Sequence, residues 1–250
     1  MVQITDAQKE QFQQEGYLLL EKVIPDDLLQ ILRDECERYM HLINQEMDAK
    51  GVDVMGLNHR DKRYFIPMKY KDSEQLPTFL FSELMADVCR ATIGDEAYLF
   101  LEQYVVKMAE VGMKFSWHQD SGYIDFPHRP YLTCWCTLDD VTEENGTVYI
   151  LPFSEAGTRE RIEHTIDTET NDRVGYHGDA TGIPVILPAG SIAAFWSTTL
   201  HRSGANTTDS MRRIFLAQYS AEPLLSPDGE AWRWVEPFIK NGEIIANETS

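Results

Sequence analysis

The sequence is poor in cysteine and contains no long apolar run. Four cysteines among 250 residues are too few for a disulfide scaffold, and they favour a reducing compartment. No apolar run approaches the roughly 18 residues that are needed to cross a bilayer. At the N-terminus, no basic region precedes an apolar stretch as it does in a secretory signal. The sequence therefore predicts a cytoplasmic protein with no membrane partner.

Basic residues are also scarce. The chain has 22 lysines and arginines against 41 aspartates and glutamates, which gives a net charge of −19. A protein this acidic is a poor general partner for nucleic acid, because the phosphate backbone repels it. Hydrophobic residues make up 43% and charged residues 25%, so an ordinary globular fold is expected.

The length is compatible with one large domain or two small ones. The sequence shows no linker, internal repeat or low-complexity tract, so we predict a single domain over residues 1–250. A chain of this size buries about three quarters of its unfolded surface on folding. It therefore needs neither a disulfide nor a metal ion merely to fold.

The first part of the chain has helical patterns. A capping-box pair, Thr5 and Gln8, opens a helix for which Gly16 is the expected stop. Apolar residues at helical spacing predict a long helix over residues 25–51. A third helix is expected over residues 77–94.

The pattern then changes to short β-rich runs separated by turn residues. They lie near residues 98–108, 113–119, 131–138, 147–151, 183–187, 191–196 and 212–220. Helices followed by many strands indicate sheets with helices packed outside them. We therefore predict N-terminal helices over about 1–94 and a β core over about 97–220. The polar segment 155–182 is expected to be a long loop or short helices.

The strongest local signal is the tetrapeptide Trp117-His118-Gln119-Asp120. In an extended segment, residues two apart point to the same side, so His118 and Asp120 present an imidazole and a carboxylate together. A further histidine, His201, follows the predicted strand 191–196. Two histidines and one carboxylate form the facial triad of non-haem iron(II) oxygenases. Zinc binds the same ligand types, so these residues alone leave the metal open.

Two arginines follow His201 after a segment of turn residues. Arg212 and Arg213 open the last predicted strand, which places a guanidinium near the metal site. A guanidinium binds a carboxylate through two parallel hydrogen bonds. The arrangement suits a dicarboxylate that chelates the metal at one end. Strand parity alone does not choose between the two arginines.

Several segments, in this order, resemble the phytanoyl-CoA dioxygenase-like family of Fe(II)/2-oxoglutarate-dependent oxygenases. They are Glu15-Gly16-Tyr17, Trp117-His118-Gln119-Asp120, Leu138-Asp139-Asp140-Val141-Thr142, Asn145-Gly146, His201-Arg202-Ser203-Gly204-Ala205-Asn206 and Arg212-Arg213. The resemblance implies a mainly β fold with flanking helices, a double-stranded β-helix of the jelly-roll or cupin type. It also implies iron bound by His118, Asp120 and His201. The family's spacing favours Arg212 as the partner of the distal carboxylate of 2-oxoglutarate.

The resemblance also implies the reaction. Iron(II), 2-oxoglutarate and O2 together oxidise an unactivated C–H bond of a small organic molecule, giving succinate and CO2. Hydroxylation is the expected outcome. Desaturation, epimerisation and cyclisation use the same oxidising chemistry and remain alternatives. A metal-binding jelly roll without turnover, a zinc hydrolase and a regulatory protein on a decayed oxygenase fold are further alternatives.

Three more residues resemble positions that contact 2-oxoglutarate in relatives. Ser203 lies two residues after His201 and can donate a hydroxyl hydrogen bond to the same carboxylate. Gln103 and Lys107 share one face of the strand that precedes the metal motif. An ordinary solvated sheet face is the other explanation for this pair.

Candidate substrate contacts lie after the metal motif and on later strands. Tyr123, Phe126 and His128 belong to a loop that is expected near the iron. Trp135 and Trp196 could line the cavity, although aromatic residues of jelly-roll strands usually pack in the core.

One basic cluster is unexpected in so acidic a chain. Arg60, Lys62, Arg63, Lys69 and Lys71 lie within twelve residues, in a predicted loop between helices. They could form a cationic rim that meets an anionic substrate. The alternative is a solvated surface whose charges are neutralised by acids elsewhere.

Overall fold

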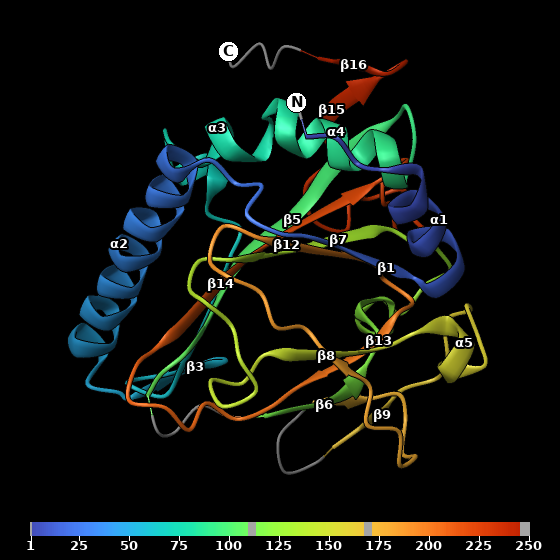
Figure 1. Ribbon diagram of the computed structural model, residues 1–250. Helices are drawn as coiled ribbons and strands as arrows, with labels where there is room; N and C mark the ends of the chain where they lie inside the picture. Colours follow the sequence, from blue (N-terminus) through green and yellow to red (C-terminus); the bar gives the residue numbers. More distant parts are fainter. Residues whose placement is uncertain (1, 110–113, 168–171, 246–250) are drawn as a thin grey trace.

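Two antiparallel β-sheets face each other and form the centre of the fold (Figure 1). The computed structural model describes residues 2–109, 114–167 and 172–245. The larger, ten-stranded sheet has the order β1-β12-β7-β14-β5-β4-β3-β2, and β15 and β16 extend it beside β5. The smaller sheet has the order β11-β8-β13-β6, and β9 and β10 form a separate hairpin. The predicted jelly roll with flanking helices is confirmed.

The strands of the larger sheet come from almost the whole chain. They are β1 (Tyr17–Leu20), β2 (Val54–Met55), β3 (Asn58–His59), β4 (Arg63–Pro67), β5 (Ala97–Lys107), β7 (Leu132–Thr137), β12 (Ile192–Trp196), β14 (Arg212–Ser220), β15 (Glu236–Lys240) and β16 (Glu243–Ile244). The smaller sheet and the hairpin consist of β6 (Phe115–His118), β8 (Val148–Leu151), β11 (Ile183–Pro184), β13 (Leu200–Ser203), β9 (Thr165–Ile166) and β10 (Arg173–Val174). The larger sheet thus takes strands from both sides of the predicted β core.

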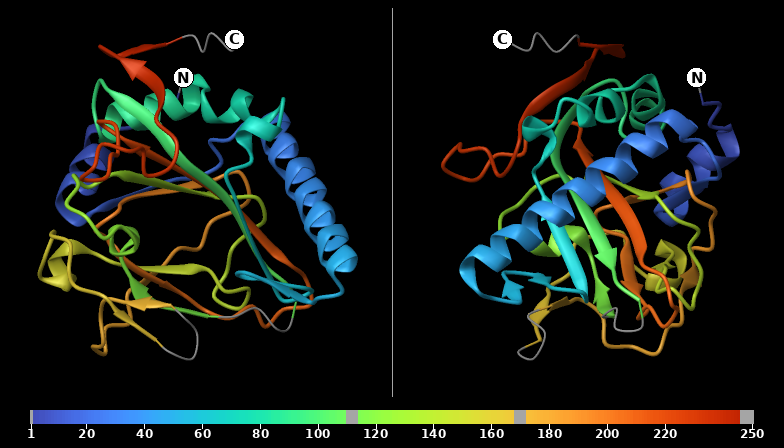
Figure 2. Two further views of the ribbon diagram at one scale, coloured as in Figure 1. Left: turned by 180° about the vertical axis from the view of Figure 1, so that it is seen from behind. Right: turned by 90° about the vertical axis from the view of Figure 1, so that its left-hand side faces the viewer.

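Helices cover the outer face of the larger sheet. They are α1 (Asp6–Glu15), α2 (Asp26–Lys50), α3 (Leu76–Leu80) and α4 (Glu83–Thr92), while α5 (Phe153–Ala156) and the 3-10 helices η1 (Tyr70–Asp72) and η2 (Asp120–Tyr123) are short. In the right-hand view of Figure 2, α2 crosses the strands of this sheet diagonally. Apolar side chains of these helices and of the outward-facing strand positions form the largest buried cluster. Their burial leaves the inner face of the sheet free to build a site.

The predicted helix starts and stops are confirmed at the first two helices. Thr5 and Gln8 form the capping box of α1, and Gly16 ends it with a φ of 87°. Gly51 ends α2 in the same left-handed conformation. The prediction of one helix over 77–94 is wrong, because Ser82 caps α4 by accepting a hydrogen bond from the Met85 amide.

Several predicted loops contain strands instead. Arg63 of the basic cluster begins β4, Arg60 and Lys62 lie in the turn between β3 and β4, and the long polar segment contains the β9–β10 hairpin. His201 lies within β13 and does not merely follow a strand. These strands have two to five residues each, too few for a clear alternation of polar and apolar side chains. Residue 113, the first of one predicted strand, lies outside the described residues.

Within the part of the chain that the structure describes, no helix is both long enough and apolar enough to span a membrane. The four cysteines are buried and free.

Candidate active site

A cavity of about 680 Å³ lies between the two sheets. Its size falls within the range of about 300–1,000 Å³ that is usual for sites that bind small molecules. Alternate residues of β5 and β14 face it, since the two strands pair in register with Lys107 opposite Arg212. Both sheets therefore contribute side chains to one space.

The three predicted metal ligands meet at one end of this cavity. His118 ends β6, His201 lies opposite it on β13, and Asp120 begins η2. The Nε2 atom of His201 is 3.5 Å from Oδ1 of Asp120, and Nε2 of His118 is 4.0 Å from the same oxygen. One ligand atom from each residue falls within a group no wider than 4.8 Å. Metal–donor bonds of about 2 Å place neighbouring donors roughly 3 Å or slightly more apart, so this set needs only a small contraction around an ion.

Backbone carbonyls hold both imidazoles in the orientation that a metal requires. Nδ1 of His118 lies 2.8 Å from the Ser116 carbonyl oxygen, and Nδ1 of His201 lies 3.0 Å from that of Thr199. A carbonyl only accepts, so each Nδ1 carries the proton and each Nε2 keeps its lone pair for the cavity. Burial and the neighbouring His201 lower the pKa of His118, which also favours the neutral, metal-binding form.

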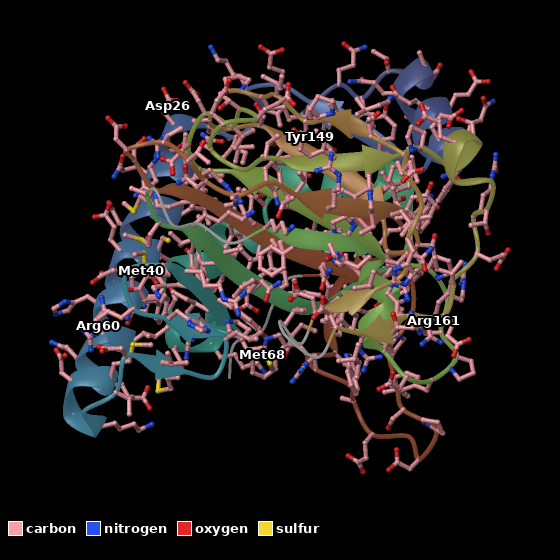
Figure 3. All side chains as sticks on the ribbon, turned by 90° about the horizontal axis from the view of Figure 1, so that it is seen from below. Asp26, Met40, Arg60, Met68, Tyr149 and Arg161 are labelled. Carbon is pink, nitrogen blue, oxygen red and sulfur yellow. The ribbon has the colours of Figure 1, made fainter. Side chains whose placement is uncertain are left out.

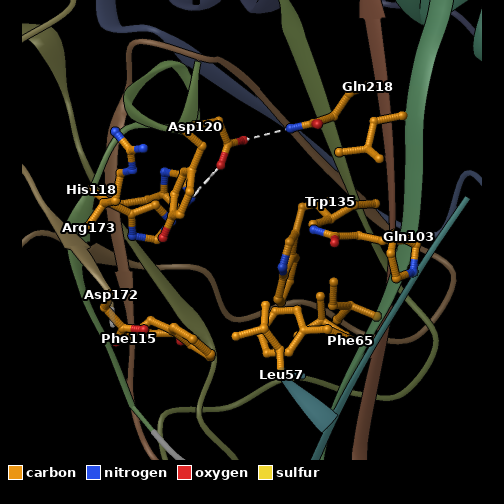
Figure 4. Close-up of a pocket in the computed structure, with 18 of the residues that line it drawn as sticks. Leu57, Phe65, Gln103, Phe115, His118, Asp120, Trp135, Asp172, Arg173 and Gln218 are labelled. Atoms are coloured by element: carbon orange, nitrogen blue, oxygen red, sulfur yellow. Dashed lines mark hydrogen bonds and ion pairs between the residues drawn. The ribbon is translucent and has the colours of Figure 1, made fainter. Parts of the chain in front are cut away.

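The carboxylate of Asp120 is held in a similar way. Its Oδ2 accepts hydrogen bonds from the Thr133 hydroxyl at 2.6 Å and from the Gln218 amide at 2.9 Å. These donors occupy one oxygen and leave Oδ1 facing the two imidazoles, as Figure 4 shows for Asp120 and Gln218. Two neutral imidazoles and one carboxylate oxygen on one side of an ion form the facial set that suits iron(II).

Sequence reasoning missed Thr133 and Gln218, and their effect can be measured. In Gln218→Leu, Oδ2 of Asp120 keeps one donor instead of two, so we expect about a tenfold loss of iron(II) affinity. At saturating iron, the Michaelis constant for 2-oxoglutarate should change little. A metal titration followed by kinetics separates the two effects. Gln45→Leu on the exposed face of α2 is the control, and equal metal affinities in both variants contradict the role of Gln218.

Gln119, the residue between His118 and Asp120, connects three segments of the chain through hydrogen bonds. The Gln119 side chain donates to the carbonyls of Glu160 and Thr198 and accepts from the Ile162 amide. Its backbone amide donates to Nε2 of His164 at 2.9 Å. No local sequence pattern marks this histidine, because the contact spans 45 residues.

The fit around His164 explains two glycines. A Cβ at Gly122 would lie 2.5 Å from the His164 ring, and one at Gly175 would lie 2.6 Å from it. Both glycines are therefore needed for the ring to approach the metal-binding segment closely.

At the other end of the cavity, Arg212 is buried without a full set of partners. One of its terminal nitrogens donates to the Gly146 carbonyl at 2.9 Å, and its other two nitrogens have no hydrogen-bond partner in the described structure. Burial lowers the pKa of Arg212 to about 10. Buried donors left unpaired are costly, so a ligand carboxylate at this position fits them.

Lys107 and Ser203 lie beside this guanidinium. The Lys107 ammonium donates to the Ser203 hydroxyl oxygen at 2.7 Å and also contacts the Gly204 carbonyl. Burial, together with the nearby Arg212 and Arg63, lowers the pKa of Lys107 well below its usual value. Since Ser203 accepts from the lysine, its own proton is available to a ligand. The grouping therefore favours an anionic group such as a carboxylate over an apolar one.

The structure separates the two arginines that strand parity could not. Arg213 points to the outside of the sheet, where it forms two hydrogen bonds with the Asp139 carboxylate and one with Glu37. Arg212 alone of the pair lines the cavity.

The other predicted contacts divide into two groups. Gln103, Tyr123 and Trp135 line the cavity, and Figure 4 shows Gln103 and Trp135 across the space from His118. Phe126, His128 and Trp196 are not among its lining residues.

Each of the three residues that do not line the cavity has another packing role. Trp196 packs on Phe12 of α1, at a ring distance of 4.8 Å. Phe126 belongs to a buried cluster, and His128 lies 3.1 Å from the Ser121 hydroxyl. These three are structural contacts in the described structure.

The predicted cationic rim does not form. Arg60 pairs with Asp48 and Asp53 beside α2, where Figure 3 labels it, and Arg63 is 4% exposed beneath the Phe65 and Phe115 rings. Neither these arginines nor Lys62 line the cavity. The cluster is mainly a structural feature of β3 and β4.

A jelly roll with this triad at one end of its cavity and a buried arginine at the other defines the class of Fe(II)/2-oxoglutarate-dependent oxygenases. The comparisons with known proteins agree. The family model for phytanoyl-CoA dioxygenase (PhyH) matches residues 12–214. The chain belongs to this family and is an Fe(II)/2-oxoglutarate-dependent dioxygenase with iron and 2-oxoglutarate as its cofactors.

Individual relatives are distant. The peroxisomal phytanoyl-CoA dioxygenase of Mus musculus is 22% identical over 238 residues, which cover 87% of this chain and 69% of that protein. EvdO2 of Micromonospora carbonacea var. aurantiaca, solved with 2-oxoglutarate, is 22% identical with a TM-score of 0.71, over 92% of this chain and 96% of that one. The epimerase SnoN, solved with Fe3+ and alpha ketoglutarate, is 18% identical with a TM-score of 0.65, over 95% and 96%. At these identities the structures show the shared fold.

Proposed function

We propose that this protein hydroxylates an unactivated C–H bond of a small organic molecule with O2 and 2-oxoglutarate, releasing succinate and CO2. The proposal depends on one observation: the cavity has a set of metal ligands at one end and an anion-binding group at the other. Two imidazole lone pairs and one carboxylate oxygen converge at one end, and unpaired guanidinium donors lie at the other. A molecule with a chelating head and a distal carboxylate satisfies both.

In this proposal His118, Asp120 and His201 hold the iron. Bound iron with 2-oxoglutarate supplies the oxidising chemistry, so no side chain is required as a general base in the main step. The task of the triad residues is to keep three donors on one side of the ion. The carbonyls behind the imidazoles and the donors behind Asp120 keep them there without reorganisation.

Arg212 receives the distal carboxylate of 2-oxoglutarate. Ser203 adds a hydroxyl donor, Lys107 adds charge, and Gln103 lies on the same face of β5 as Lys107. The carboxylate supplies the counter-charge that the buried Arg212 and Lys107 lack. The same contacts orient the cosubstrate along the cavity.

Aromatic residues provide the remaining wall. Phe65, Phe115 and Trp135 line the cavity between its two ends, and Tyr123 lies with its ring edge-on to His118 at 5.7 Å. They exclude water from the oxidising centre and hold an apolar part of the substrate close to it. Tyr123 and Trp135 are the substrate contacts that we retain.

Epimerisation, desaturation and cyclisation remain alternative outcomes of the same chemistry. SnoN, which has this fold, is described as an epimerase. Product analysis by mass separates these outcomes, since hydroxylation adds an oxygen atom and epimerisation leaves the mass unchanged. The four free, buried cysteines agree with our proposal of a reducing, cytoplasmic location.

Succinate formation tests the proposed activity. With iron(II), 2-oxoglutarate and O2, we expect slow succinate release. A suitable small molecule should accelerate it at least about tenfold, because a bound substrate couples the conversion of 2-oxoglutarate to its own oxidation. Zinc in place of iron should abolish the release, as should removal of O2. Succinate that is equally fast with zinc contradicts an oxygenase, and substrate turnover with zinc but without succinate favours a hydrolase.

A further inference from the structure

One wall of the cavity lies outside the segment that matches the family. Trp232 and Arg233 line the cavity, whereas the family match ends at residue 214. This wall is therefore a feature of this chain beyond the matched segment. It stands apart from the iron ligands and from Arg212, all of which lie within that segment.

The wall is firmly attached to the sheet. The amide of Trp234 donates to the Phe100 carbonyl at 2.9 Å, and its indole N–H donates to the buried Glu102 carboxylate at 3.1 Å. The amide of Trp232 donates to the Leu224 carbonyl at 3.0 Å. Arg233 is thus held between two anchored tryptophans.

Trp232 offers an aromatic surface to the cavity. Its ring packs edge-on against Phe126 at 5.5 Å and joins the cluster that contains Phe100 and Tyr131. It is only partly buried, so one side remains available. Leu57, more than half exposed, lies at the same cavity and extends the apolar surface. A ring-shaped apolar body fits such a surface.

The charge of the cavity is opposite to that of the protein. Its lining has five basic residues and three acidic ones, while the whole chain has 22 and 41. The basic residues are Lys107, Arg173, Arg202, Arg212 and Arg233, and the acidic ones are Asp120, Asp125 and Asp172. Lys107 and Arg212 are assigned to the distal carboxylate of 2-oxoglutarate, so a charged group of the substrate has to be met by one of the other cations.

Most of these cations are already engaged. Arg173 forms two hydrogen bonds with the Asp125 carboxylate, and Arg202 donates to the Thr181 carbonyl and lies over the Tyr149 ring. The guanidinium of Arg233 has no hydrogen bond or ion pair to residues 2–109, 114–167 or 172–245; its only charge contact there is with the Trp232 ring.

We propose that the substrate is a monoanionic, amphipathic small molecule, whose anionic group binds Arg233 and whose ring-shaped apolar body packs on Trp232. This inference rests on the proposed function, since it assigns the substrate of that site. A polyanion such as an acyl-CoA thioester fits less well, because one guanidinium is available at this wall and a net charge of −19 repels multiple negative charges.

Two fluorescent probes that differ in one charge test the proposal. Anilinonaphthalene sulfonate is a monoanionic aromatic amphiphile, and phenylnaphthylamine has the same rings without the sulfonate. In the presence of 2-oxoglutarate, we expect Arg233→Gln to weaken binding of the sulfonate about fivefold at low salt and to leave the neutral probe unchanged. The difference should shrink as salt rises, because exposed charges are screened.

Two further variants serve as controls. Arg129→Gln removes an exposed guanidinium that does not line the cavity, and it should change neither probe. Trp232→Gln should weaken both probes, since both pack on the ring. The proposal is wrong if Arg233→Gln binds the sulfonate as the wild type does, or if it loses both probes equally.

These measurements need neither iron nor turnover. If the probes behave as expected and succinate never forms, the assignment of Trp232 and Arg233 as an anion-binding wall is supported and the proposed oxygenase activity is wrong. If succinate forms and the probes show no dependence on Arg233, the activity stands and this assignment of the substrate fails.

Discussion

Replacing His201 by alanine is expected to abolish succinate formation and to lower iron(II) affinity at least about 100-fold. The change removes one of three protein ligands, and the loss of residues that only orient ligands already costs about 10–100-fold. The fold should survive, because a core of this size does not depend on the metal. A metal titration and a thermal unfolding curve on the same sample separate loss of the site from loss of the structure.

His41→Ala is the matched control for this prediction. His41 is exposed on α2 and contacts Gln45. We expect it to keep both metal affinity and activity. Wild-type turnover in His201→Ala after anaerobic loading with iron contradicts the assignment of the ligands. If His201→Ala unfolds as well as losing the metal, the same measurements are made on His118→Ala. His118 lies at the end of β6, whereas His201 lies within β13.

Part of the candidate metal site could be predicted because two of its residues are close in sequence. His118 and Asp120 are two residues apart, and strand parity alone places them on one side. His201 was a candidate only through its place after a predicted strand, since its approach to His118 depends on the pairing of β13 with β6 across 83 residues. Thr133 and Gln218, which hold Asp120, come from two strands of the other sheet. No local pattern marks such contacts.

For the basic cluster, closeness in sequence led to a wrong prediction of a binding surface. Arg60, Lys62 and Arg63 are close in sequence, and their charges suggest a binding surface. The structure places Asp48 on α2 and Asp53 just before β2 against Arg60, and it buries Arg63 across from Lys107. A count of neighbouring charges cannot reveal counter-charges from other elements. Arg233, which lines the cavity and has no ion pair within the described residues, is isolated in the sequence and carries no such signal.

The choice between two adjacent arginines depends on register. A shift of one residue exchanges the two faces of a strand, so Arg212 and Arg213 are equivalent until the pairing of β14 is known. Its register with β5 places Arg212 opposite the cavity-lining Lys107. Asp139 then fixes the outward position of Arg213 through two hydrogen bonds to its guanidinium.

Replacing Arg212 by leucine is expected to raise the Michaelis constant for 2-oxoglutarate about 10- to 100-fold. A charge-assisted hydrogen bond contributes about 1.5–3 kcal/mol, and each 1.4 kcal/mol corresponds to tenfold in affinity. Because the lost interaction is with the distal carboxylate and not with the reacting end, saturating 2-oxoglutarate should restore much of the turnover number. Arg212→Lys should recover only part of the affinity, since an ammonium cannot reproduce the paired donors of a guanidinium.

Arg213→Leu is the matched control, because it removes the same group from the next position of the same strand. It breaks the contacts with Asp139 and Glu37 on the outer face, so we expect a modest loss of thermal stability and an unchanged Michaelis constant for 2-oxoglutarate. Steady-state kinetics at varied 2-oxoglutarate, with unfolding curves for both variants, provides the comparison. The reverse pattern, with 2-oxoglutarate affinity lost in Arg213→Leu and kept in Arg212→Leu, means that the cosubstrate does not lie along the inner face of β14. A loss of equal size in both variants means that the site responds to distortion of the strand and not to a contact with one guanidinium.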